Sequence, residues 1–283
     1  MAGAQYGERV TASPGPHRAA VLGSPIAHSL SPVLHNAAYT ALGLDGWRYT
    51  AHECREDELR GFIAGLDPTW VGLSLTMPLK RVALDIADEI SERAAAIGAA
   101  NTLILGDGRC YADNTDAPGM VDALREAGIT TVERPLIIGA GGTAQAGLAA
   151  LRELAAGPVT VVVREPARAR DLAATAERLG MAMELVRFTE VEPLLTAADL
   201  IVSTVPKGTV DRFAAVPLRP GAVVFDVVYD PWPTPLVAAA TAAGCRVVSG
   251  LDLLLHQAGH QVTLMTGRPA PLAAMRAALS AAR

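Results

Sequence analysis

Lysine is rare in this chain, and its two positions are the first candidates for chemistry. Only Lys80 and Lys207 are lysines among the 24 lysine and arginine residues. A lysine ammonium can exchange a proton when its surroundings favour it, whereas an arginine guanidinium stays charged in proteins. Lys80 is therefore a candidate for proton transfer, while Lys207, in a Pro-Lys-Gly loop, is interpreted as a surface residue.

Four segments of the first half concentrate uncharged polar side chains around predicted strand and helix ends. They are residues 23–32, 74–80, 98–102 and 113–116. Polar side chains at strand ends are typical of ligand crevices in α/β proteins. Each also has a local explanation, because Ser31 and Asp116 suit helix N-caps, and Thr76 and Asn101 suit turns. Taken one at a time, the residues leave both explanations open.

A glycine-rich turn in the second half points to nucleotide binding. The pattern Gly139-x-Gly141-x-x-Ala144 follows a predicted strand at 136–138 and opens a predicted helix that runs to Leu154. The first glycine permits a tight turn, the second lets the backbone approach a pyrophosphate, and the alanine allows close packing of helix on strand. The helix N-terminus adds N–H donors for an anion. This context predicts a dinucleotide site.

The elements that must hold these residues alternate between strands and helices. In the first half, we predict strands at 19–22, 47–52 and 71–75, a hairpin over 102–112, and helices at 32–42, 57–66, 80–90, 91–97 and 120–127. In the second half, strands at 136–138, 159–163, 185–188, 200–205, 223–227 and 246–248 alternate with helices at 167–179, 191–197 and 235–243. This alternation predicts a parallel sheet wrapped by helices.

The fold class is therefore α/β, with two domains. Residues 1–115, which carry the four polar segments after a loose tail at 1–17, form one domain, and residues 116–250 form a Rossmann-type dinucleotide domain. The remaining stretch, 251–283, is predicted to hold two helices. Substrate and cofactor are expected to meet in a cleft between the domains.

Composition narrows the class of protein. The formal net charge is −5 and basic residues do not cluster, which argues against a nucleic-acid surface. A run of about 18 apolar residues, the length a membrane span needs, does not occur. Three scattered cysteines fit a reducing compartment, so we expect a cytoplasmic protein. His256 and His260 are four apart but enclose no Glu, so no metal is expected. The oligomeric state stays open, with a homodimer as one option.

The order of the motifs resembles that of the shikimate dehydrogenase family. The segments GSPIAHSLSP, SLTMPLK, GAANTL, DNTD, GAGGTA and GLDLLLHQA follow the family spacing from about Val21 to Ala258. The stretch 229–235 is most similar to members from GC-rich actinobacteria. The family reduces 3-dehydroshikimate to shikimate reversibly with NADPH, on the chorismate route to the aromatic amino acids. The resemblance implies the same activity here, with residues 1–115 as the substrate-binding domain and the helices of 251–283 packed back on it.

The resemblance also implies roles for individual side chains. Ser29 and Ser31 match serines that bind the substrate carboxylate with help from Tyr229, and Thr76, Asn101 and Gln257 match groups that bind the ring hydroxyls. Lys80 and Asp116 match the catalytic pair. Hydride arrival at a carbonyl carbon builds charge on its oxygen, which Lys80 can neutralise with a proton while Asp116 holds the ammonium.

On the cofactor side, the resemblance extends to the glycine turn and the start of the last helices. The pyrophosphate loop corresponds to Gly139, Gly141, Gly142, Thr143 and Ala144, and the nicotinamide contacts correspond to Gly250 and Leu253, with Leu in place of a frequent Met. Two departures stand out. Ser74 replaces a usual Asn, and Val163-Arg164-Glu165 replaces Asn-Arg-Thr.

The second departure bears on cofactor choice. An acidic residue after the second strand of a Rossmann domain favours NAD, and an arginine there favours NADP. Arg164 and Arg168 outnumber Glu165, so NADP is expected and NAD is the alternative. Three further alternatives stay open: an NAD-dependent quinate/shikimate dehydrogenase, an aminoshikimate dehydrogenase, and a non-catalytic nucleotide-binding paralogue.

Overall fold

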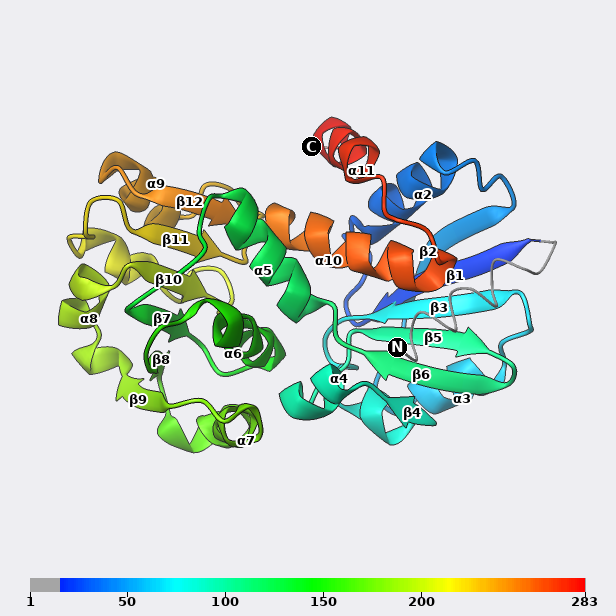
Figure 1. Ribbon diagram of the computed structural model, residues 1–283, viewed down its shortest axis with the longest axis horizontal. Helices are drawn as coiled ribbons and strands as arrows, with labels where there is room; N and C mark the ends of the chain where they lie inside the picture. Colours follow the sequence, from blue (N-terminus) through cyan, green and yellow to red (C-terminus); the bar gives the residue numbers. More distant parts are fainter. Residues whose placement is uncertain (1–15, 283) are drawn as a thin grey trace. The chain divides into compact units, whose positions relative to one another are not determined.

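The computed structural model describes residues 16–282, apart from the side chain of Arg168 (Figure 1). The chain forms two compact units. The first takes the residues up to Thr115 and those from Leu254 onward, and the second is Asp116–Leu253. Most of the expected loose tail lies outside the described residues. The expectation was wrong at His17, which already pairs with Trp47 in the first strand.

The first unit is built on a mixed six-stranded sheet (Figure 1). Its strands are β1 (His17–Gly23), β2 (Trp47–Glu53), β3 (Trp70–Leu75), β4 (Glu89–Ile90), β5 (Thr102–Gly106) and β6 (Arg109–Asp113), in the order β2-β1-β3-β5-β6-β4. Strand β1 is parallel to both of its neighbours, and β5 is antiparallel to both of its own. The predicted hairpin is the β5–β6 pair. Its turn residues Asp107 and Gly108 both have positive φ, as a two-residue hairpin turn with Asp-Gly requires.

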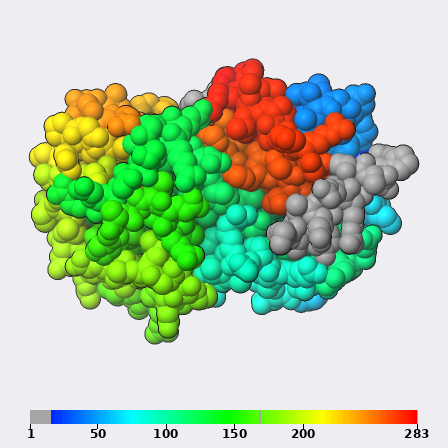
Figure 2. Space-filling view, viewed as in Figure 1, coloured from blue at the N-terminus to red at the C-terminus, as the bar shows by residue number. Residues whose placement is uncertain are grey.

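Helices cover both faces of this sheet. Leu73, Leu75 and Leu103 pack towards α3 (Leu59–Ala64), whereas Val71 and Ile104 pack with residues of α2 (Ser31–Ala41) and α10 (Gly250–Thr266). The short helix α4 (Glu92–Ile97) is capped by Ser91, whose side chain accepts from the N–H of Ala94. Helix α11 (Leu272–Ala281) packs against α2, so the last described helix lies beside the first described one (Figure 2).

The second unit is an all-parallel sheet wrapped by helices. Its strands are β7 (Pro135–Ile138), β8 (Val159–Val163), β9 (Met183–Arg187), β10 (Leu200–Ser203), β11 (Val223–Asp226) and β12 (Arg246–Ser249). They lie in the order β12-β11-β10-β7-β8-β9, and every neighbouring pair is parallel. This order is the doubly wound Rossmann arrangement, with its topological switch between β7 and β10. The predicted α/β fold class is confirmed.

Apolar residues of the strands alternate between two helical layers. Ile137 packs towards Met120 of α5 (Asp116–Glu126) and towards α6 (Gly142–Leu154), which is followed along the chain by α7 (Arg170–Leu179). Leu136 and Ile138 instead belong to a core shared with α8 (Glu192–Ala197) and α9 (Pro235–Ala242). Among the described residues, no helix combines the length and the apolar character that a membrane crossing requires.

The largest error of the sequence prediction is the helix expected at 80–90. The structure has only a 3₁₀ turn, η1 (Val82–Asp85), and then strand β4. The N–H of Asp88 donates to the carbonyl of Cys110 (2.8 Å), and its carboxylate accepts from the N–H of Cys110 (2.7 Å). Pairing with β6 therefore replaces the helical hydrogen bonds of this segment.

Smaller corrections concern element ends. Ser31 is the first residue of α2 and Leu30 occupies the N-cap, so the predicted Ser31 cap was wrong. The helix predicted at 167–179 divides into the 3₁₀ turn η2 (Pro166–Ala169) and α7, and α5 begins at Asp116 instead of Met120. Strand β9 ends at Arg187 because Phe188 turns into the core and meets the ring of Phe213 at 5.5 Å between centroids.

The packing of β3 against α10 predicts opposite effects for two glycine substitutions. A methyl group at Gly72 would come within 2.9 Å of Met265 and 3.0 Å of the Leu103 carbonyl, whereas Gly61 in α3 has open space around it. Gly72→Ala should therefore destabilise the first unit by about 1–3 kcal/mol. Gly61→Ala should stabilise it by about 0.5–1 kcal/mol through lower chain entropy. Thermal unfolding of both variants checks this, and a stable Gly72→Ala would contradict the packing.

Candidate active site

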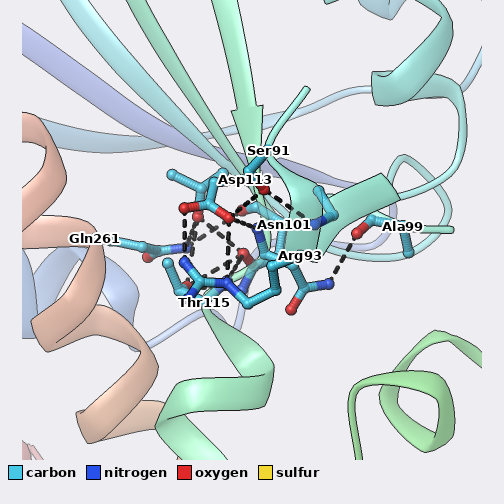
Figure 3. Close-up of polar contacts among 10 residues, drawn as sticks. Ser91, Arg93, Ala99, Asn101, Asp113, Thr115 and Gln261 are labelled. Atoms are coloured by element: carbon cyan, nitrogen blue, oxygen red, sulfur yellow. Dashed lines mark hydrogen bonds and ion pairs between the residues drawn. The ribbon is translucent and has the colours of Figure 1, made fainter. Parts of the chain in front are cut away.

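The first unit contains a cluster of hydrogen-bonded polar side chains, and the buried side chain of Asn101 is at its centre (Figure 3). Its Oδ1 accepts from the Thr102 hydroxyl (2.8 Å), the Thr115 N–H (2.7 Å) and the Thr115 hydroxyl (3.1 Å). Its Nδ2 lies 3.4 Å from the Oε1 of Gln257. The structure therefore brings two sequence-predicted substrate ligands, Asn101 and Gln257, into one hydrogen-bonded group at the start of β5.

A second glutamine, Gln261, supports this group, and the sequence analysis missed it. Its Nε2 donates to the backbone carbonyl of Asn101 (3.2 Å) and to the Thr102 hydroxyl (3.1 Å). Gln257 and Gln261 are four residues apart on α10, so they share one face of the helix. That spacing from Gln257 is the signal in the sequence that could have indicated Gln261.

Behind Gln261 lies a buried chain of neutral polar groups. Its Oε1 accepts from the Ser74 hydroxyl (2.8 Å) and lies 3.3 Å from the Nε2 of His35, and the Tyr49 hydroxyl donates to Ser74. The His35 ring stacks on Tyr49 at 3.9 Å. Burial lowers the pKa of His35 to about 3 and raises that of Tyr49. Ser74, the residue that replaces the family's Asn, is thus an interior link between β3 and α10.

The Asp113–Asp116 segment is fixed by a buried carboxylate. Asp113 accepts from the Ser91 hydroxyl (2.6 Å) and forms a two-point contact with Arg93, at 3.2 Å to Nε and 2.7 Å to a terminal nitrogen (Figure 3). The Asn114 side chain donates to the carbonyl of Ala99 (2.9 Å). These contacts hold the residues immediately before Asp116, which is itself buried and begins α5.

The two predicted carboxylate-binding serines lie together at the start of α2. The Ser29 hydroxyl accepts from the N–H of Ser31 at 3.3 Å, and Ser31 is buried while Ser29 is half-buried. Thr76 follows β3, and its N–H donates to the carbonyl of Leu22 (2.9 Å). Gly23 permits this approach, because a methyl group there would lie 2.3 Å from the Thr76 methyl.

Lys80 is held in the turn that follows β3. Its carbonyl accepts from the N–H of Ala100 (2.7 Å), which attaches the turn to the segment that carries Asn101. The Lys80 side chain is half-buried. In the first unit, Lys80, Thr76 and Asn101 therefore stand at the ends of β3 and the beginning of β5, which are paired strands.

Tyr229 lies in the second unit, in the loop after β11. The buried carboxylate of Asp226 holds this loop by accepting from the N–H of Val228 (3.2 Å) and from the Thr234 hydroxyl (2.8 Å). Burial raises the pKa of Tyr229, and the neighbouring Asp230 adds to the effect. Gly250 is required next to this loop, because a methyl group there would lie 2.0 Å from the Val227 carbonyl oxygen. Leu253, one turn along α10, is buried.

Gly139 and Gly141 of the glycine turn differ in whether the fold itself requires a glycine there. Gly139 has φ +118, and a methyl group there would come within 2.4 Å of the Thr204 hydroxyl, so the fold itself requires this glycine. Gly141 has an extended backbone and nothing within 4 Å of an added methyl group. Since neither backbone nor packing demands Gly141, the open space before Gly142 and Thr143 of α6 fits a pyrophosphate on the helix N-terminus. Ala144 is fully buried, as close packing on the sheet requires.

The residues that bear on cofactor choice follow β8. Arg164 and Glu165 are both exposed, and Glu165 precedes the 3₁₀ turn η2 without capping it through its side chain. The Arg168 side chain lies outside the described part of the chain. Among the described residues, no group of three His, Cys, Asp or Glu side chains could hold a metal ion.

A doubly wound sheet with a glycine turn, joined to a unit with a polar cluster, defines the class of two-domain dinucleotide-dependent oxidoreductases. Three family models match this chain. They are the shikimate dehydrogenase substrate binding domain over residues 21–103, shikimate / quinate 5-dehydrogenase over 123–210, and the shikimate 5′-dehydrogenase C-terminal domain over 250–279. The chain belongs to the shikimate dehydrogenase family.

Proteins of similar sequence match this chain over nearly its whole length. Shikimate dehydrogenases (NADP(+)) of Moorella thermoacetica and Methanothermobacter thermautotrophicus are each 38% identical, over 90% and 93% of this chain and 90% and 95% of their own. The crystal structure of Mycobacterium tuberculosis shikimate dehydrogenase is 45% identical with a TM-score of 0.86, covering 94% of this chain and 100% of that one.

The same fold also occurs with another activity. The ligand-free 5-ketofructose reductase of a Gluconobacter strain is 27% identical with a TM-score of 0.83, over 96% of this chain and 100% of its own. The fold alone therefore does not define the substrate.

The buried His35 predicts a pH-dependent stability. Because its pKa falls from 6.5 to about 3 on folding, the unfolded chain binds more protons than the native chain between these values. The free energy of unfolding should therefore decrease as the pH falls from 6.5 towards 3, by up to about 1.4 kcal/mol per pH unit from this group. His35→Phe, which keeps a ring against Tyr49, should show a flatter pH profile in denaturant unfolding. The exposed His28→Gln is the matched control, and equal slopes in all three proteins would exclude His35 as the cause.

The two glycines of the turn should fail in different ways. Gly139→Ala should lower the thermal midpoint, because of its positive φ and the contact with Thr204. Gly141→Ala should leave that midpoint unchanged but weaken dinucleotide binding by about 1–3 kcal/mol, the usual effect of an overfilled contact. Thermal unfolding and calorimetric titration with NADP⁺ measure the two effects, and a destabilised Gly141→Ala would show that this position serves the fold.

Proposed function

We propose that this protein reduces 3-dehydroshikimate to shikimate reversibly with NADPH, in aromatic amino acid biosynthesis. The observation that carries the proposal is the end-to-end match, at 38% identity, to relatives named shikimate dehydrogenase (NADP(+)). A solved neighbour from Thermus thermophilus, 36% identical with a TM-score of 0.82 over 94% of this chain and 100% of its own, is a complex with NADP(H) and shikimate. The motif residues of this chain support the same activity.

The first unit is the proposed substrate domain, with the C-terminal helices contributing to it. Ser29 and Ser31, joined at 3.3 Å, bind the carboxylate with Tyr229. Thr76, Asn101 and Gln257 bind the ring hydroxyls, and the contact of Asn101 with Gln257 supports a common target. A buried site built for hydroxyl groups discriminates strongly against analogues that lack them, since its own polar groups would be left unpaired.

Lys80 and Asp116 are the proposed acid–base pair. The Lys80 ammonium gives a proton to the carbonyl oxygen as negative charge develops there, and Asp116 orients the ammonium. Arginine would not give up that proton readily, which accounts for a lysine in a chain so rich in arginine.

The second unit is the proposed NADP domain. When bound, the nicotinamide supplies a hydride equivalent to the substrate carbonyl. Gly139, Gly141, Gly142, Thr143 and Ala144 would hold the pyrophosphate at the N-terminus of α6, and Gly250 and Leu253, in the first turn of α10, would contact the nicotinamide. Arg164 and Arg168 bind the 2′-phosphate. We propose a cytoplasmic location, small molecules as the partners, and a homodimer as the assembly.

A direct assay separates this proposal from its alternatives. The purified protein is mixed with shikimate or quinate and with NADP⁺ or NAD⁺, and absorbance of the reduced nicotinamide is followed. We expect the highest kcat/KM for shikimate with NADP⁺. Comparable kcat/KM on quinate would move the protein to the quinate/shikimate class, and turnover of neither substrate would favour a non-catalytic paralogue. 5-Ketofructose with the reduced cofactor, followed by the loss of its absorbance, is the control for the second activity seen on this fold.

Substitution of Lys80 tests the proton-transfer step. Lys80→Ala should lower kcat for shikimate about 10²–10⁴-fold, the usual contribution of a positioned acid–base group. Lys80→Arg keeps the charge and should lose nearly as much, while KM changes less because the other substrate ligands remain. Asp116→Asn should also lower kcat. Steady-state kinetics measure these effects, and near-normal kcat in Lys80→Ala would remove this lysine from the mechanism.

A further inference from the structure

A pocket in the second unit is lined by four basic side chains, of which only Arg164 belongs to the proposed cofactor site. Its volume is about 610 Å³, and its lining includes Arg164, Arg187, Lys207, Arg212, Thr189 and Thr209. Neither Asp nor Glu is among its lining residues. Four positive side chains around one pocket are unexpected in a chain with net charge −5. They indicate a site for an anion.

The pocket lies where a doubly wound sheet binds its ligands. Arg164 follows β8, Arg187 ends β9, and Lys207 lies in the loop after β10. Strands β8 and β10 are the two neighbours of β7, whose carboxyl end leads into the glycine turn. Arg164 and Lys207 therefore come from the strands on both sides of that turn, beside the switch point of the sheet.

The positive charges are available to a ligand. Within the described residues, none of the four cations forms an ion pair with a carboxylate, and the nearby Glu190 carboxylate accepts from the backbone N–H of Arg187 (3.3 Å). Arg212 is held in place by two rings, with its guanidinium 5.4 Å from the centroid of Phe188 and 4.8 Å from that of Phe213. Glu165, the acidic residue next to Arg164, does not line the pocket.

We infer that Lys207 and Arg187, together with Arg164, bind the 2′-phosphate of the dinucleotide and select NADP over NAD. The inference rests on the proposed function for the identity of the cofactor. A phosphate dianion is best held by several charge-assisted donors, and arginine forks and a lysine ammonium supply them. The hydroxyls of Thr189 and Thr209 are further donors on the same wall.

This assignment changes the interpretation of the second lysine and of the acidic neighbour. Lys207 is exposed in a loop, as the sequence indicated, but it lines the cationic pocket instead of facing solvent alone. Glu165 repels a 2′-phosphate only weakly when three cations surround that group on other sides. The preference for NADP therefore comes from three loops, and the dipeptide after β8 supplies one part of it.

Binding of nucleotide fragments tests the pocket without turnover. Adenosine 2′,5′-bisphosphate and 5′-AMP differ only in the 2′-phosphate, and both are titrated calorimetrically into the full-length protein. Lys207→Gln and Arg187→Gln should each weaken binding of the bisphosphate about tenfold, as loss of one charge-assisted contact does, and leave 5′-AMP within about twofold. Arg152→Gln, an exposed change of equal charge near the far end of α6, should leave both unchanged. Circular dichroism confirms that each variant is folded.

The outcomes separate this inference from the proposed function. Unchanged bisphosphate affinity in both variants, or equal weakening of both nucleotides, would overturn the role of Lys207 and Arg187 in phosphate selection. Selective binding of the bisphosphate through these residues, without oxidation of shikimate, would support the phosphate-binding role of the pocket and contradict the proposed function. Oxidation of shikimate with NADP⁺, together with variants that still discriminate fully between the two nucleotides, would support the proposed function and contradict the role of the pocket.

Discussion

The carboxamide of Asn101 is the interaction on which the first unit depends. A buried polar atom must find hydrogen-bond partners, and the Oδ1 of Asn101 finds three of them in Thr102 and Thr115. Those contacts fix the start of β5 against the end of β6. Gln261 then connects the same strand start to α10, and through Ser74 to β3. One set of amide and hydroxyl groups therefore joins three strands to a helix that is distant in sequence. The candidate substrate ligands Asn101 and Gln257 belong to this set.

Much of the fold could be predicted, because its signals are local. The strand runs, the Asp107-Gly108 turn and the glycine pattern at 139–144 each depend on a few neighbouring residues. The segment at 80–90 could not be predicted in this way, because its conformation is decided by the pairing of Asp88 with Cys110. Gln261 was missed for a related reason. Its partners are far away in sequence, and only the fold brings Ser74 and His35 to it.

Cofactor selection, like the position of Gln261, depends on residues that are far apart in the sequence. In the sequence, Arg164 and Glu165 argue in opposite directions, and two adjacent residues cannot decide which charge a ligand meets. The doubly wound sheet adds residues from further along the chain, since it brings the carboxyl ends of β8, β9 and β10 to the same edge of the sheet. Positive side chains spread from Arg164 to Arg212 along the chain then line a single pocket. The residues at one strand end therefore account for only some of the charges that a ligand would meet.

The route of the chain between the two units has a consequence for biosynthesis. The chain leaves the first unit at Thr115 and returns to it only at Leu254. When the ribosome has released the first 115 residues, His35 and Ser74 lack Gln261, and the apolar face of the sheet lacks Met265. The second unit is uninterrupted and can fold as soon as it emerges. At about 5–20 residues per second, the earliest-made part of the protein must wait on the order of ten seconds for its last helices. During that interval the apolar face that Met265 covers in the folded protein stays exposed.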